Sequence, residues 1–204
     1  MPVKVKICGV RTVADAVAAA EAGADFLGVN FHPASPRCVG ADTARAIVAA
    51  VPGVPCIGVF VDRPADEVAR TARDVGLAGV QLHGSERAAD CGPLRGLRVV
   101  KALHARPGGD LVAAAAEWPD AWLLIDAWVP GVAGGTGRTV DPEALRGLPA
   151  DRLFVAGGLR PDNVADVVRR VRPFAVDVAS GVERAPGVKD HGKVAEFIRR
   201  AHAA

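Results

Sequence analysis

The sequence predicts an α/β fold, a closed (β/α)₈ barrel, and three observations support this prediction. Short apolar runs alternate with helical patterns along the whole chain, as in folds built on a parallel sheet. Eight such runs within 204 residues leave about 25 residues for each strand–helix unit, close to the minimum for a complete barrel. Polar residues interrupt the runs mostly toward their carboxyl ends, where this architecture carries its active site. An open doubly wound sheet shares the alternation, but the count of eight and the placement of the polar residues favour closure.

The eight runs are predicted to be buried strands because they are rich in β-branched residues and often unbroken by polar ones. No linker, low-complexity tract or change of composition divides the chain, so we expect one domain over residues 1–204. The runs span Val3–Cys8, Asp25–Phe31, Val54–Val61, Gly79–His83, Leu97–Leu103, Trp122–Asp126, Leu153–Gly157 and Ala175–Ala179.

Helix signals lie between these runs. Thr12 with Asp15 forms a capping-box pattern, and Asp141-Pro142 reads as an N-cap followed by proline at the first helical position. A further helix is predicted to open at Pro161. Apolar residues at the i, i+3, i+4 and i+7 positions mark stripes that dock helices on a sheet. These stripes begin at Val13, Val164 and Val194.

The composition excludes several classes of partner. With 25 basic and 23 acidic residues the net charge is only +2, so the chain lacks the basic excess typical of nucleic-acid binding. No apolar run approaches the roughly 20 residues of a membrane span, and the amino terminus lacks the apolar core of a signal peptide. The four cysteines form no CxxC pattern. We therefore expect a cytoplasmic protein with free thiols.

Polar residues of the strands fall into groups that share a face, because side chains alternate along a strand. Burying such groups without partners costs several kcal/mol, so we expect them, and Lys101 on the fifth run, to pair with each other or with a ligand. Strands one and eight are neighbours in a closed barrel, so we expect Lys6 to pair with Asp177; the alternative is that both reach solvent. The groups are Lys4, Lys6 and Cys8 on the first run and Gln81 and His83 on the fourth; Asp126 shares its face with Leu124 on the sixth run, and Asp177 with Ala179 on the eighth.

Two glycine-containing turns predict a phosphate site. Gly157-Gly158 follows the seventh run and Ser180-Gly181 follows the eighth, and in this fold a phosphate is often held by the loops after these two strands. Glycines let backbone N–H groups approach the anion. Either turn alone is also consistent with an ordinary tight turn. Gly134-Gly135-Thr136-Gly137 has neither the spacing nor the lysine of a P-loop, so we interpret it as a flexible loop beside the site.

Arg37 follows the second run in the segment Ser35-Pro36-Arg37. Its guanidinium suits a carboxylate, which it binds through two parallel hydrogen bonds. From position alone, a solvated surface arginine is an equally good interpretation.

Eight blocks of residues, in order from the first strand to the last helix, resemble the phosphoribosylanthranilate isomerase family. The agreement of eight separate blocks makes the resemblance specific. The blocks are Lys6-Ile7-Cys8-Gly9; Phe31 with Ser35-Pro36-Arg37; Gly58-Val59-Phe60-Val61; Val80-Gln81-Leu82-His83-Gly84; Leu124-Ile125-Asp126-Ala127; Gly134-Gly135-Thr136-Gly137; Ala156-Gly157-Gly158-Leu159 with Pro161 and Asn163; and Asp177 to Ser180-Gly181-Val182-Glu183 with Pro186-Gly187 and Lys189-Asp190.

The resemblance implies an isomerase of tryptophan biosynthesis that works without cofactor or metal. It converts N-(5-phosphoribosyl)anthranilate to 1-(2-carboxyphenylamino)-1-deoxyribulose 5-phosphate by an Amadori rearrangement. Carried over by position, Asp126 is the general acid toward the furanose ring oxygen and Cys8 is the general base toward the proton on C2. Arg37 binds the anthranilate carboxylate, and the turns at Gly157-Gly158 and Ser180-Gly181 hold the phosphate.

These two roles set an electrostatic demand. The site must hold the two pKa values apart, so that Asp126 keeps its proton while Cys8 gives up its own. We expect Lys6 or backbone dipoles to lower the pKa of Cys8. His83 offers either a proton shuttle or, as we favour, a structural hydrogen bond or weak substrate contact. Lys6, Gln81, His83 and Asp177 are thus expected to support the catalytic pair.

Two other functions compete with this one. A related sugar-phosphate isomerase, acting in histidine biosynthesis or in both pathways, resembles two half-barrels with a phosphate site in each and an aspartate on strand one. Here strand one ends in Cys8, and Val61-Asp62-Arg63-Pro64 after the third run lacks a glycine-rich phosphate signature. A non-catalytic phosphate-binding barrel is expected to lack one catalytic residue, and both are present. No apolar surface pattern indicates a partner subunit, so we expect a monomer with a small-molecule substrate.

Overall fold

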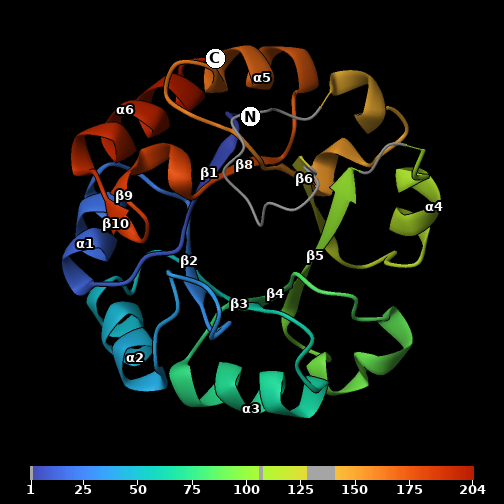
Figure 1. The fold of residues 1–204 in the computed structure, drawn as a ribbon, viewed down its shortest axis with the longest axis horizontal. Helices are drawn as coiled ribbons and strands as arrows, with labels where there is room; N and C mark the ends of the chain where they lie inside the picture. Colours follow the sequence, from blue (N-terminus) through green and yellow to red (C-terminus); the bar gives the residue numbers. More distant parts are fainter. Residues whose placement is uncertain (1, 106–107, 128–140) are drawn as a thin grey trace.

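A computed structural model describes residues 2–105, 108–127 and 141–204. Eight parallel strands form a closed barrel in sequence order, and the last strand pairs with the first (Figure 1). The predicted (β/α)₈, or TIM, barrel is therefore confirmed. The strands are β1 Lys4–Cys8, β2 Phe26–Asn30, β3 Cys56–Phe60, β4 Gly79–Leu82, β5 Arg98–Ala105, β6 Trp122–Ala127, β7 Leu153–Val155 and β8 Ala175–Val178.

Helices form an outer ring around the barrel (Figure 1). The connection from β4 to β5 carries two 3₁₀ turns, η1 Ala88–Asp90 and η2 Gly92–Leu94, in place of an α-helix. In the described part of the chain, no helix combines the length and apolar character that crossing a membrane requires. The α-helices are α1 Val13–Glu21, α2 Ala41–Ala50, α3 Ala65–Val75, α4 Leu111–Ala116, α5 Val164–Val171 and α6 His191–His202; the other 3₁₀ turns are η3 Pro142–Leu145, η4 Ala150–Arg152 and η5 Ser180–Val182.

The predicted helix starts hold with two adjustments. The Thr12 hydroxyl caps α1 by accepting from the Asp15 N–H at 3.1 Å. Asp141 caps as predicted, but the helix it starts is the single 3₁₀ turn η3. The helix predicted at Pro161 begins at Val164, because residues 161–163 form a turn that Asn163 closes by accepting from the Arg160 N–H at 2.8 Å.

The core has two layers. One lies between the barrel and the helices, and the other fills the barrel interior. At the amino ends of the strands the interior holds an aromatic cluster of Phe26, Trp122, Phe154 and Phe174, with ring centroids 5.2 to 6.4 Å apart. This cluster closes one end of the barrel, so the polar interior residues gather toward the other.

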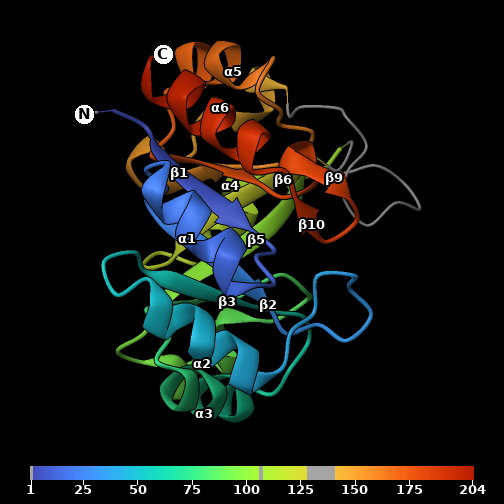
Figure 2. The same cartoon turned by 90° about the vertical axis from the view of Figure 1, so that its left-hand side faces the viewer.

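A short antiparallel hairpin follows β8, and no strand was predicted there. Its strands are β9 Glu183–Ala185 and β10 Val188–Lys189. It lies outside the barrel, toward the end that also carries the loop after β2 (Figure 2). Gly187 in its turn has a φ of +76°, and a Cβ there would come 2.6 Å from the Pro36 carbonyl oxygen. The hairpin therefore packs closely on the segment that carries Arg37.

Candidate active site

A series of polar contacts crosses the barrel interior from β8 to β6. The Lys6 ammonium donates to Asp177 Oδ1 at 2.8 Å and to Gln81 Oε1 at 2.9 Å. Gln81 Nε2 lies 2.8 Å from His83 Nδ1, and His83 Nε2 lies 3.8 Å from Asp126 Oδ2. The predicted pairing of Lys6 with Asp177 is confirmed, and the alternative that both reach solvent is wrong because Lys6 is fully buried. The common face of Gln81 and His83 was also predicted, whereas the contacts of Lys6 with Gln81 and of His83 with Asp126 were not.

Lys6 is the electrostatic centre of this series. Burial by itself disfavours its charge, but the neighbouring Asp177 and Cys8 outweigh burial and raise the pKa of Lys6 above its ordinary value. Lys6 therefore stays an ammonium in the barrel interior. Its positive charge stabilises the carboxylate of Asp177 and would also stabilise a thiolate at Cys8.

Cys8 lies next to Lys6 at the end of β1. Gly28 on β2 makes the room, since a Cβ there would come 2.8 Å from the Cys8 sulfur and 3.2 Å from Lys6 Nζ. Burial raises the pKa of the Cys8 thiol, and Asp177 raises it too, whereas Lys6 and Lys189 lower it. The expectation that Lys6 brings the pKa of Cys8 below its ordinary value is wrong in its net direction, because burial outweighs the lysine.

Asp126, His83 and His104 form one cluster at the carboxyl ends of β4, β5 and β6. His104 is the register partner of Asp126, and the rings of His83 and His104 lie edge to face with centroids 5.5 Å apart. Burial lowers the pKa of His83 to about 4, and the positive charges of His104, Lys6 and Lys101 act in the same direction. His83 is therefore neutral near pH 7.

The apolar runs of the sequence do not single out His104. The fifth predicted strand ends at Leu103, whereas β5 continues to Ala105. Val100 and Ala102 face the barrel interior, so the same alternation carried one step further would have placed His104 beside Asp126.

The same cluster is the one group, within residues 2–105, 108–127 and 141–204, whose donor atoms lie close enough to share a metal ion. The donor atoms of His83, His104 and Asp126 are all within 4.8 Å of one another. Two imidazoles and a carboxylate are a donor set that suits several divalent metals.

Arg37 is held in an ion pair and does not point freely into solvent. Its Nε and Nη2 each donate to a carboxylate oxygen of Glu183 at 2.7 Å, so the interpretation as a solvated surface arginine is wrong. Glu183 also accepts from Lys189 at 3.0 Å, and Lys189 donates to the Ala179 carbonyl at 2.9 Å. Burial opposes the charge of Glu183, but the bonds from Arg37 and the charge of Lys189 hold its pKa below the usual range.

Two cations thus share one carboxylate, and the triad of Arg37, Glu183 and Lys189 carries a net positive charge. Such a triad suits an anionic ligand. Glu183 and Lys189 have no predicted role, because nothing in the sequence pattern shows that the hairpin folds back onto Arg37. Gly9, directly after Cys8, has a φ of +73°, and a Cβ there would come 3.1 Å from Arg37 Cγ. Gly9 therefore lets the arginine stem lie against the end of β1.

The two turns predicted to bind phosphate lie against each other. Gly157 and Gly158 both have positive φ, +84° and +62°, which only glycine adopts readily. Asn163 steadies this turn by donating to the Gly158 carbonyl at 2.9 Å. A Cβ at Gly181 would overlap the carbonyl oxygen of Leu159, so the turn containing Ser180 and Gly181 touches the first turn directly. The third glycine segment, Gly134–Gly137, lies outside the described residues.

Lys101 lies apart from this site. It donates to Glu86 at 2.6 Å and to the Gly84 carbonyl at 2.7 Å, and both charged side chains are almost fully buried. Lys101 alternates with the interior residues Val100 and Ala102, so it points out of the barrel. The expectation that it pairs is confirmed, but its partner belongs to the loop after β4.

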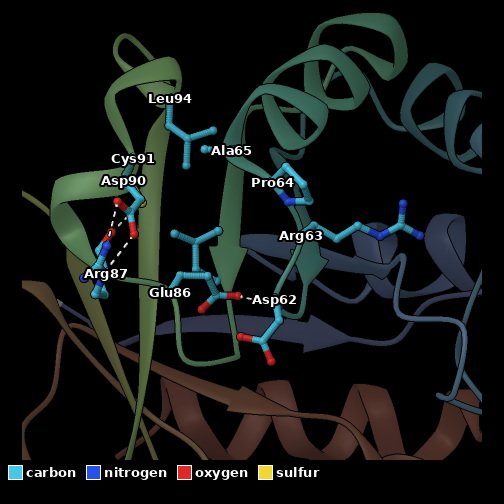
Figure 3. A pocket seen from close by; sticks show the side chains of 10 residues that line it. Asp62, Arg63, Pro64, Ala65, Glu86, Arg87, Asp90, Cys91 and Leu94 are labelled. Atoms are coloured by element: carbon cyan, nitrogen blue, oxygen red, sulfur yellow. Dashed lines mark hydrogen bonds and ion pairs between the residues drawn. The ribbon is translucent and has the colours of Figure 1, made fainter.

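A cavity of about 300 Å³ lies beside this pair, between the start of α3 and the segment after β4 (Figure 3). Most of the charged residues that line the cavity already form hydrogen bonds or ion pairs with one another or with backbone groups. Arg87 donates to Asp90 at 2.9 Å, and Glu86 accepts from the Asp62 N–H at 2.9 Å. None of the predicted site residues that the structure describes lines it. The cavity is therefore separate from the candidate active site.

The comparisons with known proteins agree with the sequence resemblance. The model of the N-(5'phosphoribosyl)anthranilate (PRA) isomerase family matches residues 5–200. The chain is 48% identical to the N-(5'-phosphoribosyl)anthranilate isomerase of Thiobacillus denitrificans over 205 residues, covering 100% of each. It is 48% identical to the enzyme of the same name from a Geobacter species over 200 residues, covering 97% of each.

Solved structures extend the likeness to the fold. Phosphoribosyl anthranilate isomerase from Thermotoga maritima superposes with a TM-score of 0.91 at 37% identity, covering 99% of this chain and 100% of that one. A structure of phosphoribosyl anthranilate isomerase in complex with reduced 1-(o-carboxyphenylamino)-1-deoxyribulose 5-phosphate superposes at 0.87 with 35% identity and the same coverage. A family model over nearly the whole chain and relatives of nearly half-identical sequence lead to one conclusion: the chain belongs to the phosphoribosylanthranilate isomerase family.

Proposed function

We propose that Cys8 and Asp126 carry out the reaction of this family, the Amadori rearrangement of N-(5-phosphoribosyl)anthranilate in tryptophan biosynthesis. The observation that carries the proposal is the placement of these two side chains. Cys8 ends β1 and Asp126 lies near the end of β6, at the mouth of one barrel. This is the end at which (β/α)₈ enzymes build their active sites.

The reaction needs one acid and one base. Asp126 gives its proton to the furanose ring oxygen, the C1–O bond breaks with its electron pair going to oxygen, and the nitrogen lone pair forms a C1=N iminium. Cys8, as thiolate, then removes the proton from C2, and the C–H electrons form a C1=C2 enolamine while nitrogen regains its lone pair. Transfer of a proton to C1 and loss of the O2 proton give the ketone. C2 is oxidised and C1 reduced within one molecule, so this aldose–ketose isomerisation needs no external oxidant or reductant.

The substrate carries two anionic groups, and the site offers a place for each. The triad of Arg37, Glu183 and Lys189 has one unbalanced positive charge, which the anthranilate carboxylate balances. Nη1 of Arg37 takes no part in the bidentate pair with Glu183 and is the nitrogen we assign to the substrate. The turns at Gly157-Gly158 and Ser180-Gly181 would hold the phosphate through backbone N–H groups.

The test is the decay of anthranilate-substrate fluorescence with substrate generated in situ. Cys8→Ala and Asp126→Asn should each lower kcat by roughly 10²–10⁴-fold, the usual contribution of a general acid or base. A matched control is Cys38→Ala, since Cys38 is a free, partly buried thiol on the loop after β2. Wild-type rates in both catalytic variants would overturn the assignment even though the fold stands.

We also propose that residues 1–204 form one catalytic domain that works as a cytoplasmic monomer on a small-molecule substrate, with no nucleic-acid partner. The near-balanced charge of +2 supports the last point, and four free cysteines suit a reducing compartment. Sedimentation equilibrium at micromolar concentration tests the monomer directly. A concentration-dependent mass of twice 21.0 kDa would refute it.

A further inference from the structure

The series of polar contacts from Lys6 to Asp126 has a defined order of hydrogen-bond donors and acceptors, and Lys6 sets that order. An ammonium can only donate hydrogen bonds, so the Gln81 atom that faces Lys6 at 2.9 Å must be the amide oxygen. The other end of the amide, Nε2, can only donate, and it lies 2.8 Å from His83 Nδ1. Nδ1 must therefore accept. The proton of the neutral His83 ring then sits on Nε2, the nitrogen that faces Asp126 Oδ2 at 3.8 Å.

We propose that Gln81 is a positioning residue that locks His83 as a neutral Nε2–H donor aimed at the carboxyl group of Asp126. The inference rests on the proposed function, because it gives His83 a part in the proton transfer from Asp126. The present distance of 3.8 Å is longer than a hydrogen bond, and a carboxylate attracts an N–H more strongly than a carboxylic acid does. The contact therefore strengthens as Asp126 gives up its proton, which is the kind of interaction that raises kcat.

Neither the His83 ring nor the Gln81 amide can reverse its donor and acceptor atoms without an unfavourable contact. A proton on His83 Nδ1 would set two donors against each other across 2.8 Å. Turning the Gln81 amide to relieve this would set its NH₂ group against the Lys6 ammonium. Lys6 cannot move aside easily, since it is fully buried and paired with Asp177 at 2.8 Å. The pKa of His83, lowered to about 4 mainly by burial, is consistent with a ring that stays neutral.

The same order of donors and acceptors bears on whether the cluster of His83, His104 and Asp126 suits a metal ion. A metal at His83 Nε2 would need that nitrogen without its proton, and Nδ1–H would then need an acceptor. Gln81 offers Nδ1 a donor instead. The residues His83, His104 and Asp126 are close enough for a metal, but the hydrogen-bond direction favours an N–H donor at this place.

Nitrogen-15 NMR of histidine-labelled protein tests the lock without turnover. Long-range ¹H–¹⁵N correlations distinguish the two neutral ring forms and the cation, and the spectrum of His83→Gln assigns the His83 resonances. We expect wild-type His83 to carry its proton on Nε2 and to stay neutral from pH 7 to about pH 5, within the range its pKa of about 4 allows. His191 and His202, exposed or half-exposed and paired with Asp15 and Asp25, are internal controls.

The decisive variant is Gln81→Glu, which keeps the shape of the side chain and replaces the donor by an acceptor. We expect His83 Nδ1 to become protonated in this variant, while the spectra of His191 and His202 stay unchanged. We also expect kcat to fall by about tenfold or more with KM changed by less than about threefold, because the interaction with Asp126 acts after binding.

Each outcome decides the inference. A wild-type His83 protonated on Nδ1 would overturn it, even if Gln81→Glu failed to fold. So would a Gln81→Glu protein whose His83 ring kept the wild-type proton. A different experiment refutes the proposed function, namely wild-type turnover in Cys8→Ala and Asp126→Asn. That result would leave the NMR result on the resting protein unchanged.

Discussion

Gly181→Ala is the substitution whose effect the structure defines most sharply. A Cβ at this position would overlap the Leu159 carbonyl oxygen and would lie 2.9 Å from the Leu159 carbonyl carbon. Ordinary van der Waals contact begins at 3.4 Å, so the two turns must part by at least about 0.5 Å, and the obstacle is backbone rather than a movable side chain. A phosphate hydrogen bond of ~2.9 Å that opens by this amount reaches the limit of a real bond.

The expected loss follows from that bond. A hydrogen bond to a charged group contributes about 1.5–3 kcal/mol, so losing one lowers substrate affinity by roughly 10- to 100-fold. Overpacking costs a further 1–3 kcal/mol of folding stability, or roughly 2–4 °C in Tm for each kcal/mol. Fluorescence-monitored turnover at 25 °C should show a raised KM, and a thermal melt a lowered Tm.

Gly53→Ala is the matched control, because a Cβ at Gly53 meets nothing within 4 Å and its φ lies outside the left-handed region. We expect wild-type KM and Tm for it. The reasoning would be refuted by a Gly181→Ala enzyme with wild-type KM, since the two turns would then not act together on the phosphate.

Three further predictions use the same turnover assay or unfolding in urea. Glu183→Gln should raise KM by about tenfold with a smaller change in kcat, because Arg37 loses its bidentate partner; an unchanged KM would show that Glu183 does not position it. Lys6→Met should lower the free energy of unfolding by about 3–5 kcal/mol in urea, since it leaves Asp177 buried without its ion pair, and a loss under 1 kcal/mol would contradict this. Because the pKa of Cys8 is raised, its proton stays on in the folded chain to higher pH than in the unfolded chain, so folding stability should fall as pH increases through that range. A free energy of unfolding in urea that does not fall between about pH 8 and pH 10 would contradict the last prediction.

Strand parity was the most informative part of the sequence. It predicted that Lys6 and Asp177 meet, and they are register partners on β1 and β8. It also placed Gln81 and His83 on one face. These predictions succeed because alternation along a strand and closure of the barrel are enough to fix which side chains point inward.

What the sequence could not provide depends on contacts between distant segments. The bond from Arg37 to Glu183 joins residues 146 apart, through a hairpin whose strands have three and two residues. Strands this short carry too few residues for an alternation to be recognised. The direction in which the pKa of Cys8 shifts could not be predicted either. It depends on whether burial of the thiol, which raises the pKa, outweighs the charge of Lys6, which lowers it.

The raised pKa of Cys8 has a consequence for the order of the two proposed proton transfers. A thiol is not a base, so removal of the C2 proton must follow a change that favours the thiolate. Protonation of the ring oxygen by Asp126 makes such a change, because ring opening leaves a positive iminium next to C2. A unit charge at about 4 Å contributes ~4 kcal/mol at an effective dielectric constant near 20, equivalent to about three pKa units. Ring opening therefore comes first and makes Cys8 a usable base, and a donor at His83 that stabilises the Asp126 carboxylate favours this first step.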